Sequence, residues 1–288
     1  MKFPSQETMQ NLSSYVAPHI IGNELIKELL TLQMFSNPES GEKLHYLLVG
    51  GSSTGKSDLA LFINKVMLGR SAIIQKDATP KGAVEKLIRS NGGIVFADEF
   101  DKTKKDLRMA FLEAMQNGTV TIDKHGEHFT YNAKINITAL CNPPTPELMR
   151  EVPLQAQLSF TKDYMLLARF HFFIAIFPAD SSSYPNIAER MVLREREDEI
   201  INKLREIVIT TKQNIPTVKV SEDLARKIGD YVRYLKDINI SNSVLITPRL
   251  IDGFINATKA RSRMMLREKA EESDFDYCKM LYEKLSNQ

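Results

Sequence analysis

The feature that most constrains the fold of this chain is a glycine-rich octapeptide at residues 50–57, which reads Gly-Gly-Ser-Ser-Thr-Gly-Lys-Ser. It satisfies the phosphate-loop pattern of Gly, four residues, Gly, Lys and Ser or Thr. The apolar run 46–49 precedes it, and in the segment 58–68 that follows, apolar residues recur every three or four positions. The sequence therefore predicts a strand, a phosphate-binding loop and a helix in succession.

Each residue type in this loop has a chemical reason to be there. Glycines let successive backbone N–H groups converge on phosphates at a helix N-terminus. Lys56 supplies a positive charge to the outer phosphates, and the Ser57 hydroxyl is a ligand for Mg²⁺. The alternative interpretation is an ordinary Gly/Ser-rich turn. The candidate nucleotide-binding residues are Gly50, Gly51, Ser52, Ser53, Thr54, Gly55, Lys56, Ser57 and, from the next motif, Asp98.

Two carboxylates end a second apolar run, 94–97. At the end of a strand, Asp98 can hold the metal and its water shell, while Glu99 can polarise the water that attacks a γ-phosphate. Asn142 follows a further apolar run, 135–140, and its amide could orient that water. On its own, an Asn before Pro143 is more often a turn residue.

The distribution of apolar runs predicts an α/β fold. Runs 46–49, 72–75, 94–97, 135–140 and 170–177 have the length of buried strands, with helical patterns at 58–68 and 104–115 between them. This alternation predicts a parallel five-stranded sheet flanked by helices. Period-two alternation around His125-Gly126 predicts a β-hairpin at about 118–133.

After Pro178 the pattern changes to long, highly charged helical segments at about 187–213, 221–238, 248–269 and 273–286. We therefore expect an α/β nucleotide-binding domain over residues 1–178 and a helical lid domain over 179–288. Four cationic residues, Arg261, Arg263, Arg267 and Lys269, lie close together in one of these segments, and we expect them to form a solvated helix face.

Composition restricts the remaining possibilities. The 288 residues are 43% apolar and 26% charged, which is typical of a globular protein. No apolar run approaches the about 20 residues of a membrane span, and the N-terminus lacks a secretory pattern. We expect a cytoplasmic or nucleoid-associated protein. The net charge of +2 neither requires nor excludes nucleic acid, and both cysteines, Cys141 and Cys278, are expected to be reduced and structural.

Six ordered segments together resemble the ATPase core of the MCM helicases, within the AAA+ class. They are Ala17-Pro18-His19-Ile20-Ile21-Gly22; Asp98-Glu99-Phe100-Asp101-Lys102; the segment from Glu113 to Ala133 around the hairpin; Cys141-Asn142-Pro143; Leu166-Leu167-Ala168-Arg169-Phe170; and Ile246-Thr247-Pro248-Arg249-Leu250. The trailing Phe-Asp-Lys is not shared by generic ATPases. The resemblance covers nearly the whole chain.

The resemblance implies an AAA+ ATPase that uses ATP and Mg²⁺ and works as a hexameric ring. Lys56, Ser57, Asp98, Glu99 and Asn142 would act on the nucleotide of their own subunit. Arg169, the arginine finger, and Arg249, in the second sensor, would reach the nucleotide of a neighbour. Lys124, near the hairpin tip, would contact DNA phosphates without reading sequence. Arg169 also has a simpler interpretation, as an ion-paired residue at a helix end.

The sequence departs from the family pattern at several points. The chain begins almost at the ATPase core, so we expect the N-terminal DNA-binding and ring-forming domain to be missing, and a separate loading or N-terminal-domain partner could supply it. A second channel hairpin between Gln75 and Gly92 is expected to be missing as well. His171 replaces the customary aspartate after the finger, and Ser52-Ser53 replace Pro-Gly in the phosphate loop.

The leading interpretation is an ATP-dependent DNA helicase or translocase core. One alternative is a protein-remodelling ATPase similar to the MoxR and magnesium-chelatase relatives, which share the hairpin but act on protein clients. A second alternative is a regulatory subunit that binds ATP and barely hydrolyses it. The retained Asp98, Glu99, Asn142 and Arg169 argue against a degenerate site.

Overall fold

The computed structural model describes residues 6–124, 127–143, 164–192, 197–238 and 246–286. At its centre lies a five-stranded sheet in the order β2-β3-β6-β1-β7, and every strand pair in it is parallel. The strands are β1 (His45–Gly50), β2 (Ser71–Ile74), β3 (Ile94–Ala97), β6 (Asn136–Cys141) and β7 (Phe172–Ile176). The expected parallel five-stranded sheet is confirmed, and each strand begins and ends within two residues of the apolar run that predicted it.

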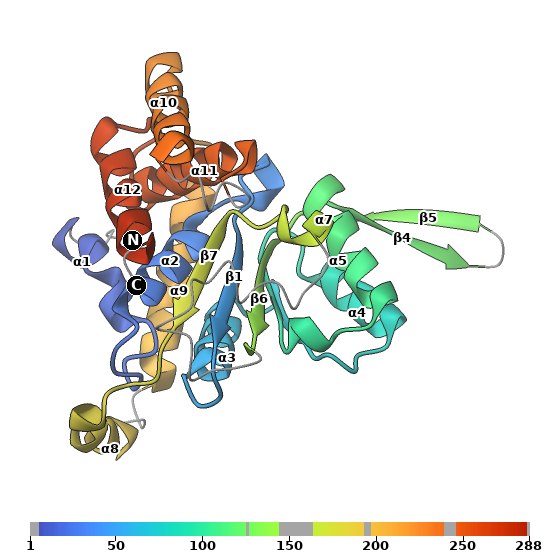
Figure 1. Cartoon of the computed structure of the whole chain (residues 1–288), viewed down its shortest axis with the longest axis horizontal. Coiled ribbons are helices and arrows are strands. Elements are labelled where there is room, and N and C mark those ends of the chain that lie inside the picture. Colours follow the sequence, from blue (N-terminus) through green and yellow to red (C-terminus); the bar gives the residue numbers. More distant parts are fainter. Residues whose placement is uncertain (1–5, 125–126, 144–163, 193–196, 239–245, 287–288) are drawn as a thin grey trace.

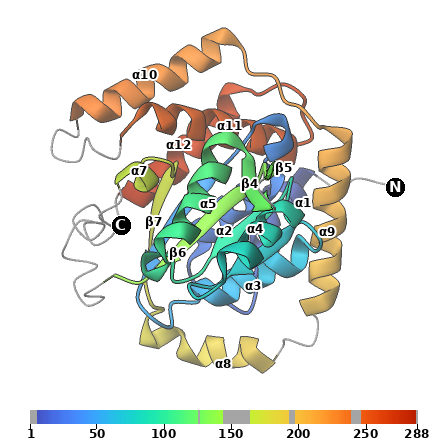
Figure 2. The ribbon, with the colours of Figure 1, turned by 90° about the vertical axis from the view of Figure 1, so that its right-hand side faces the viewer.

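Helices cover both faces of this sheet (Figure 1, Figure 2). The α-helices are α1 (Gln6–Gln10), α2 (Glu24–Phe35), α3 (Lys56–Val66), α4 (Pro80–Arg89), α5 (Lys105–Asn117), α7 (Tyr164–Leu167), α8 (Tyr184–Val192), α9 (Glu197–Asn214), α10 (Glu222–Ile238), α11 (Pro248–Met264) and α12 (Glu272–Ser286). Short 3-10 turns are η1 (Leu12–Tyr15), η2 (Pro38–Ser40), η3 (Phe100–Lys102) and η6 (Ser181–Ser183).

Strand β1 shows how its sequence produces a sheet with two buried faces. Tyr46 and Leu48 enter one apolar cluster together with α2, α3 and the C-terminal helices α9–α12. Leu47 and Val49 enter a second cluster, which contains residues of α4, α5 and α7. All six β1 residues are buried, so the strand reads as a nearly continuous apolar run, as expected for a parallel strand covered on both faces.

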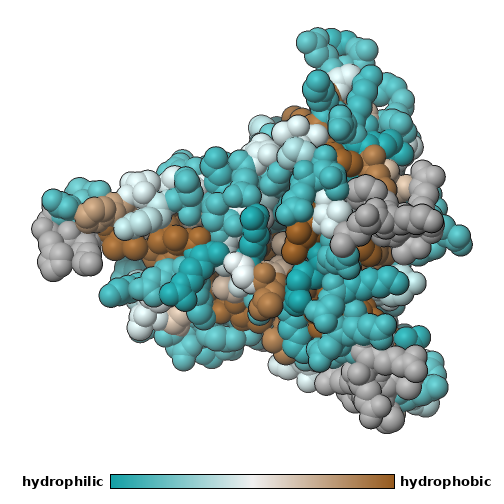
Figure 3. Space-filling view, turned by 180° about the vertical axis from the view of Figure 1, so that it is seen from behind, coloured by the Kyte–Doolittle hydropathy of each residue, from teal (hydrophilic) through white to brown (hydrophobic). Residues whose placement is uncertain are grey.

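The predicted hairpin forms β4 (Thr119–Lys124) and β5 (Glu127–Asn132), which are antiparallel and project from the body (Figure 1). Residues 125–126, the expected turn, lie outside the described residues. Val120 is buried at the base of the hairpin, whereas Phe129 and Tyr131 on β5 are 39% and 41% exposed. Apolar surface is visible along this projection in Figure 3.

The C-terminal helical patterns form as expected, with two differences in length. The pattern at 187–213 corresponds to two helices, α8 and α9. Helix α11 ends at Met264 rather than at 269, because Leu266 takes a left-handed conformation (φ +61°) and the chain then runs beside Lys219, where Lys219 and Lys269 form an isolated bridge. Within the described residues, no helix has the length and apolarity needed to cross a membrane.

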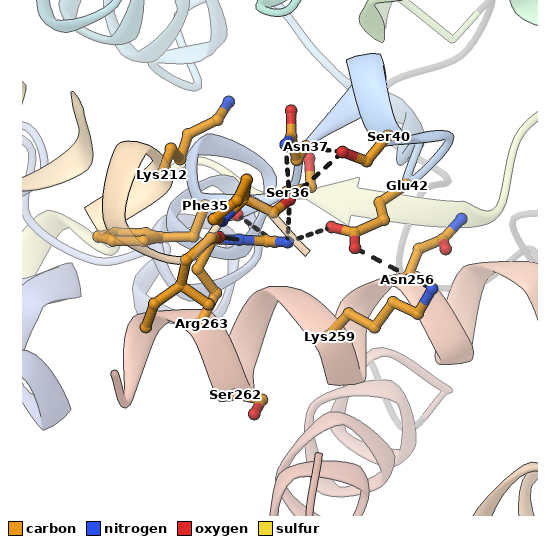
Figure 4. Close-up of polar contacts among 12 residues, drawn as sticks. Phe35, Ser36, Asn37, Ser40, Glu42, Lys212, Asn256, Lys259, Ser262 and Arg263 are labelled. Carbon is orange, nitrogen blue, oxygen red and sulfur yellow. Dashed lines mark hydrogen bonds and ion pairs between the residues drawn. The ribbon is translucent and has the colours of Figure 1, made fainter. Parts of the chain in front are cut away.

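The expectation of a solvated basic face at 261–269 is wrong for Arg263. Its side chain is fully buried and forms an ion pair with Glu42, with 2.7 Å between Nη2 and Oε2 (Figure 4). Its guanidinium also donates to the carbonyl oxygens of Phe35, Ile215 and Pro216. A charge this deeply buried needs both a counter-ion and acceptors, and here they connect α11 to the end of α2, to Glu42 after it and to the segment that follows α9.

Candidate nucleotide-binding site

The loop between β1 and α3 has a backbone that only its particular residues permit. A Cβ atom at Gly50 would lie 2.2 Å from the Ile176 side chain and 2.5 Å from its carbonyl oxygen, so β7 allows only glycine there. Gly55 has φ +86° and directly precedes Lys56, the first residue of α3. Ser53 is also left-handed, at φ +61°. The loop therefore ends at a helix N-terminus, where free N–H groups favour phosphate.

Lys56 lies inside this loop, and its side chain is 8% exposed. Its Nζ donates to the carbonyl oxygens of Gly50 (2.5 Å) and Gly51 (2.7 Å) and to the Thr54 hydroxyl (3.2 Å). Burial lowers the pKa of Lys56 to about 8, an effect that the nearby Asp98 carboxylate partly offsets. The amine is thus a partly desolvated cation, and a phosphate oxygen would be a stronger acceptor than those carbonyl groups.

The predicted carboxylates and amide meet at the same edge of the sheet. Asp98 follows β3, and its Oδ1 accepts a hydrogen bond of 3.0 Å from the Glu99 N–H. Asn142 follows β6, the strand between β3 and β1, and its backbone N–H donates to Asp101 at 3.4 Å. Since parallel strands end at one edge, Lys56, Asp98 and Asn142 share the carboxyl edge of the sheet, as predicted.

Glu99 has partners that the sequence did not predict. It occupies a left-handed backbone position (φ +47°) and forms ion pairs with Lys76 (2.5 Å), beyond the end of β2, and with Lys102 (2.6 Å), in η3. These bonds, first that from Lys102 and then that from Lys76, lower the pKa of the Glu99 carboxyl. The carboxylate is therefore held by two cations, which make it a weaker base toward water.

The residues at this edge fit a nucleotide phosphate chain with a divalent cation. The Ser57 hydroxyl is exposed at the start of α3, and Asp98 is partly exposed, so both offer the oxygen ligands that Mg²⁺ prefers. The missing Cβ of Gly50 and the desolvated Lys56 amine provide the close backbone approach and the charge that phosphates require. Ser52 and Ser53 are both exposed on the outer side of the loop.

Arg169 and Arg249 lie at the opposite, amino edge of the sheet. Arg169 lies between α7 and β7, and its Nη2 donates to the Gln116 side chain at 3.0 Å, while its Nε is buried without a hydrogen-bond partner. Arg249 lies in the first turn of α11, and burial and then the charge of Arg169 lower its pKa. Neither arginine has an ion pair among the described residues. The ion-pair interpretation of Arg169 therefore receives no support from them.

Lys43 joins this cationic group, and sequence reasoning missed it. Its Nζ donates to the Met115 carbonyl oxygen at 2.8 Å, and its pKa is lowered by burial and by the charges of Arg249, Lys134 and Arg169. Lys124, the predicted DNA contact, is elsewhere: it ends β4, where it pairs with Glu127 in the projecting hairpin. The predicted site residues thus form three separate groups.

Some of the missed residues left signals in the sequence. Lys102 belongs to the Phe-Asp-Lys extension, and Lys76 follows a predicted strand directly, so a polar residue at the carboxyl edge could have been expected there. That both contact Glu99 depends on β2 lying beside β3, which local sequence does not specify. Both cysteines are buried and unpaired, as expected.

Comparison with known proteins places these observations in a family. A family model described as the MCM P-loop domain matches residues 2–194. The chain is 27% identical to "DNA replication licensing factor mcm4" of Schizosaccharomyces pombe, over 91% of the chain and 33% of that protein. It is 25% identical to "Minichromosome maintenance protein MCM" of Saccharolobus solfataricus, over 91% and 42%, and 24% identical to "Probable DNA helicase MCM9" of Oryza sativa subsp. indica, over 90% and 43%. The chain spans less than half the length of these relatives.

Proposed function

This chain belongs to the MCM family, and from that premise we propose that it is an ATP-hydrolysing, DNA-binding motor subunit, the core of an MCM-like helicase or translocase. One observation carries the proposal: the phosphate loop and its carboxylates lie at one edge of the sheet, and two arginines that form no ion pair with any described residue lie at the other. Such a chain has both halves of a hydrolytic site and cannot join them within one copy.

We assign ATP and Mg²⁺ to the carboxyl edge. Lys56 and the loop N–H groups would bind the β- and γ-phosphates, and Ser57 and Asp98 would hold the cation. When bound, Mg²⁺ neutralises charge that develops on the phosphate oxygens. Glu99 would polarise the attacking water once it is released from Lys76 or Lys102, and Asn142 would orient that water.

The arginines would complete the site of a neighbouring copy. Strand β1 has six residues, and at about 3.3 Å per residue its two ends lie roughly 16 Å apart. Arg169, before β7, therefore lies far from the Lys56 of its own chain, beyond the reach of one side chain. Two copies arranged head to tail would bring Arg169 and Arg249 to the γ-phosphate of the next subunit, and repetition of that contact closes a ring, which we propose is a hexamer.

We assign sequence-independent DNA binding to the hairpin, with Lys124 contacting phosphates. The projection of β4 and β5 from the body is compatible with a position in a ring channel. The division into a nucleotide-binding domain (1–178) and a helical lid (179–288), a separate loading partner, and a cytoplasmic or nucleoid location remain proposals.

The proposal is tested by measuring phosphate release with and without forked DNA. We expect DNA to stimulate hydrolysis, and Lys56→Ala and Arg169→Ala each to abolish it. Lys124→Ala should weaken DNA binding and reduce the dependence of binding on salt by about one phosphate contact. Lys236→Ala, on the exposed surface of α10, is the matched control and should change neither. Hydrolysis that is independent of DNA and unaffected by Arg169→Ala would contradict the proposal.

A further inference from the structure

Two buried histidines lie at the amino edge near the arginines, and the hydrolytic mechanism above does not use them. His45 is the first residue of β1, and His171 directly precedes β7. They are 1% and 5% exposed, and their rings stack with centroids 5.2 Å apart and an interplanar angle of 20°. Buried polar groups are usually hydrogen-bonded, and Nε2 of His45 is an exception among the described residues.

Backbone contacts fix the state and orientation of both rings. The His45 N–H donates to Nδ1 of His171 at 2.9 Å, and the His171 N–H donates to the His45 carbonyl oxygen at 2.8 Å. Nδ1 of His45 accepts a hydrogen bond from the Ile137 N–H at 3.1 Å. Because each Nδ1 is an acceptor, each proton is on Nε2 and both rings are neutral.

On one side, the pair is joined to Arg169 through the C-terminal end of α5. Nε2 of His45, which forms no hydrogen bond, lies near the Met115 carbonyl group, and that carbonyl group accepts from Lys43. The next residue, Gln116, accepts the hydrogen bond of Arg169. His45 therefore lies beside the end of α5 that holds the Arg169 guanidinium.

On the other side, His171 packs directly against α11. A Cβ atom at Gly253 would lie 2.8 Å from Cβ of His171 and 3.3 Å from its ring, so glycine is what lets the helix approach this closely. Arg249 is one helical turn before Gly253 and projects from the same face. The position of His171 therefore determines how far Arg249 lies from the sheet edge.

We propose that His45 and His171 are positioning residues that fix Arg169 and Arg249 relative to each other, so that both guanidiniums reach one nucleotide of a neighbouring copy together. The inference rests on the proposed in-trans site. Neutral imidazoles suit this position because they add no negative charge beside the arginines. The aspartate expected here from the family resemblance would add a negative charge near Lys43 and Arg249, whereas His171 adds none.

The test uses His171→Ala, His171→Asn and Gly253→Ala in the full chain, with hydrolysis and ATP affinity measured separately. We expect His171→Ala to lower DNA-stimulated hydrolysis by about tenfold or more, because it leaves the buried His45 N–H without its acceptor. His171→Asn should retain most of the activity, since its amide oxygen can accept that bond. Gly253→Ala should lower activity because its Cβ pushes α11 and Arg249 away from His171, although the hydrogen bonds of both histidines can still form. ATP affinity should stay unchanged in all three.

Mixing variants separates positioning from a general loss of structure. His171→Ala keeps an intact phosphate loop, and Lys56→Ala keeps intact arginines. An equimolar mixture should therefore regain hydrolysis that neither has alone, as should a mixture of Arg169→Ala with Lys56→Ala. If Lys56→Ala regains hydrolysis when mixed with Arg169→Ala but not when mixed with His171→Ala, the positioning role of the histidines is overturned and the in-trans site is not. Loss of activity in His171→Asn equal to that in His171→Ala would also overturn it. No regain in either mixture would instead overturn the in-trans site, and the inference with it.

Discussion

Lys56 and Arg169 lie at opposite edges of one parallel sheet, Lys56 beyond the carboxyl end of β1 and Arg169 before the amino end of its neighbour β7. Because the two strands are parallel and paired along their length, the distance between Lys56 and Arg169 is set by the length of the strands. It cannot be closed by rotating side chains. Arg169 therefore does not reach a phosphate group held by Lys56 of the same copy, and in the proposed shared site the arginine comes from a neighbouring molecule.

ATP binding should be accompanied by proton uptake at alkaline pH. In the free protein, desolvation depresses the pKa of Lys56 from 10.5 to about 8, so the amine is largely neutral at pH 9. The negative phosphates favour the ammonium form and raise this pKa, so binding draws in a proton between about pH 8 and 10. Calorimetry at pH 9 in buffers of different ionisation enthalpy should give buffer-dependent binding enthalpies.

Lys56→Arg provides the control for this coupling. Its guanidinium stays protonated throughout the range, so any remaining binding should be independent of the buffer. A wild-type binding enthalpy that is identical in all buffers at pH 9 would show that Lys56 does not change its protonation on binding.

Releasing Glu99 from Lys76 should raise basal hydrolysis. The two lysine partners lower the basicity of the carboxylate and hold it in place. An exposed ion pair is worth about 0–1 kcal/mol, so Lys76→Ala should increase hydrolysis without DNA by up to about fivefold. Steady-state phosphate release measures this effect, and Glu99→Gln should abolish hydrolysis in both backgrounds. Unchanged or lower basal activity with normal ATP affinity would refute a restraining role for Lys76.

Breaking the buried Arg263–Glu42 pair should strongly destabilise the fold. Both side chains are almost completely buried, so Glu42→Ala leaves an uncompensated charge, at a cost of about 3–5 kcal/mol in the free energy of unfolding. The double variant Glu42→Leu with Arg263→Met should lose less than the sum of the single changes, since it buries no charge. Denaturant unfolding gives these values.

The exposed pair of Lys227 and Glu272 is the control, and Lys227→Ala should cost at most about 1 kcal/mol. Equal losses for both pairs would contradict this assignment.

The parts of the fold that depend on local sequence could be predicted. The apolar run before Gly50, the loop itself and the amphipathic segment after it form β1, the phosphate loop and α3, because each is specified by neighbouring residues. The meeting of Asp98 and Asn142 with Lys56 followed from parallel strands sharing one edge. Both predictions needed only the periodicity of apolar residues and the rule that parallel strands end at the same edge of a sheet.

Features that depend on distant contacts could not be predicted. Arg263 looks in the sequence like its solvated neighbours, and only the docking of α11 against residues 35–42 buries it. Lys76 reaches Glu99 because β2 pairs with β3. The stacking of His45 on His171 joins residues 126 positions apart, and no periodic pattern signals it.

The most direct test of the account is hydrolysis by a mixture of Lys56→Ala and Arg169→Ala, each inactive alone. If one copy supplies the phosphate loop and its neighbour supplies the arginine, mixed assemblies contain some sites with both groups intact. DNA-stimulated phosphate release should then appear on mixing and pass through a maximum as the ratio varies. Mixtures that stay inactive at every ratio, although sizing shows that the two variants assemble together, would contradict a shared site.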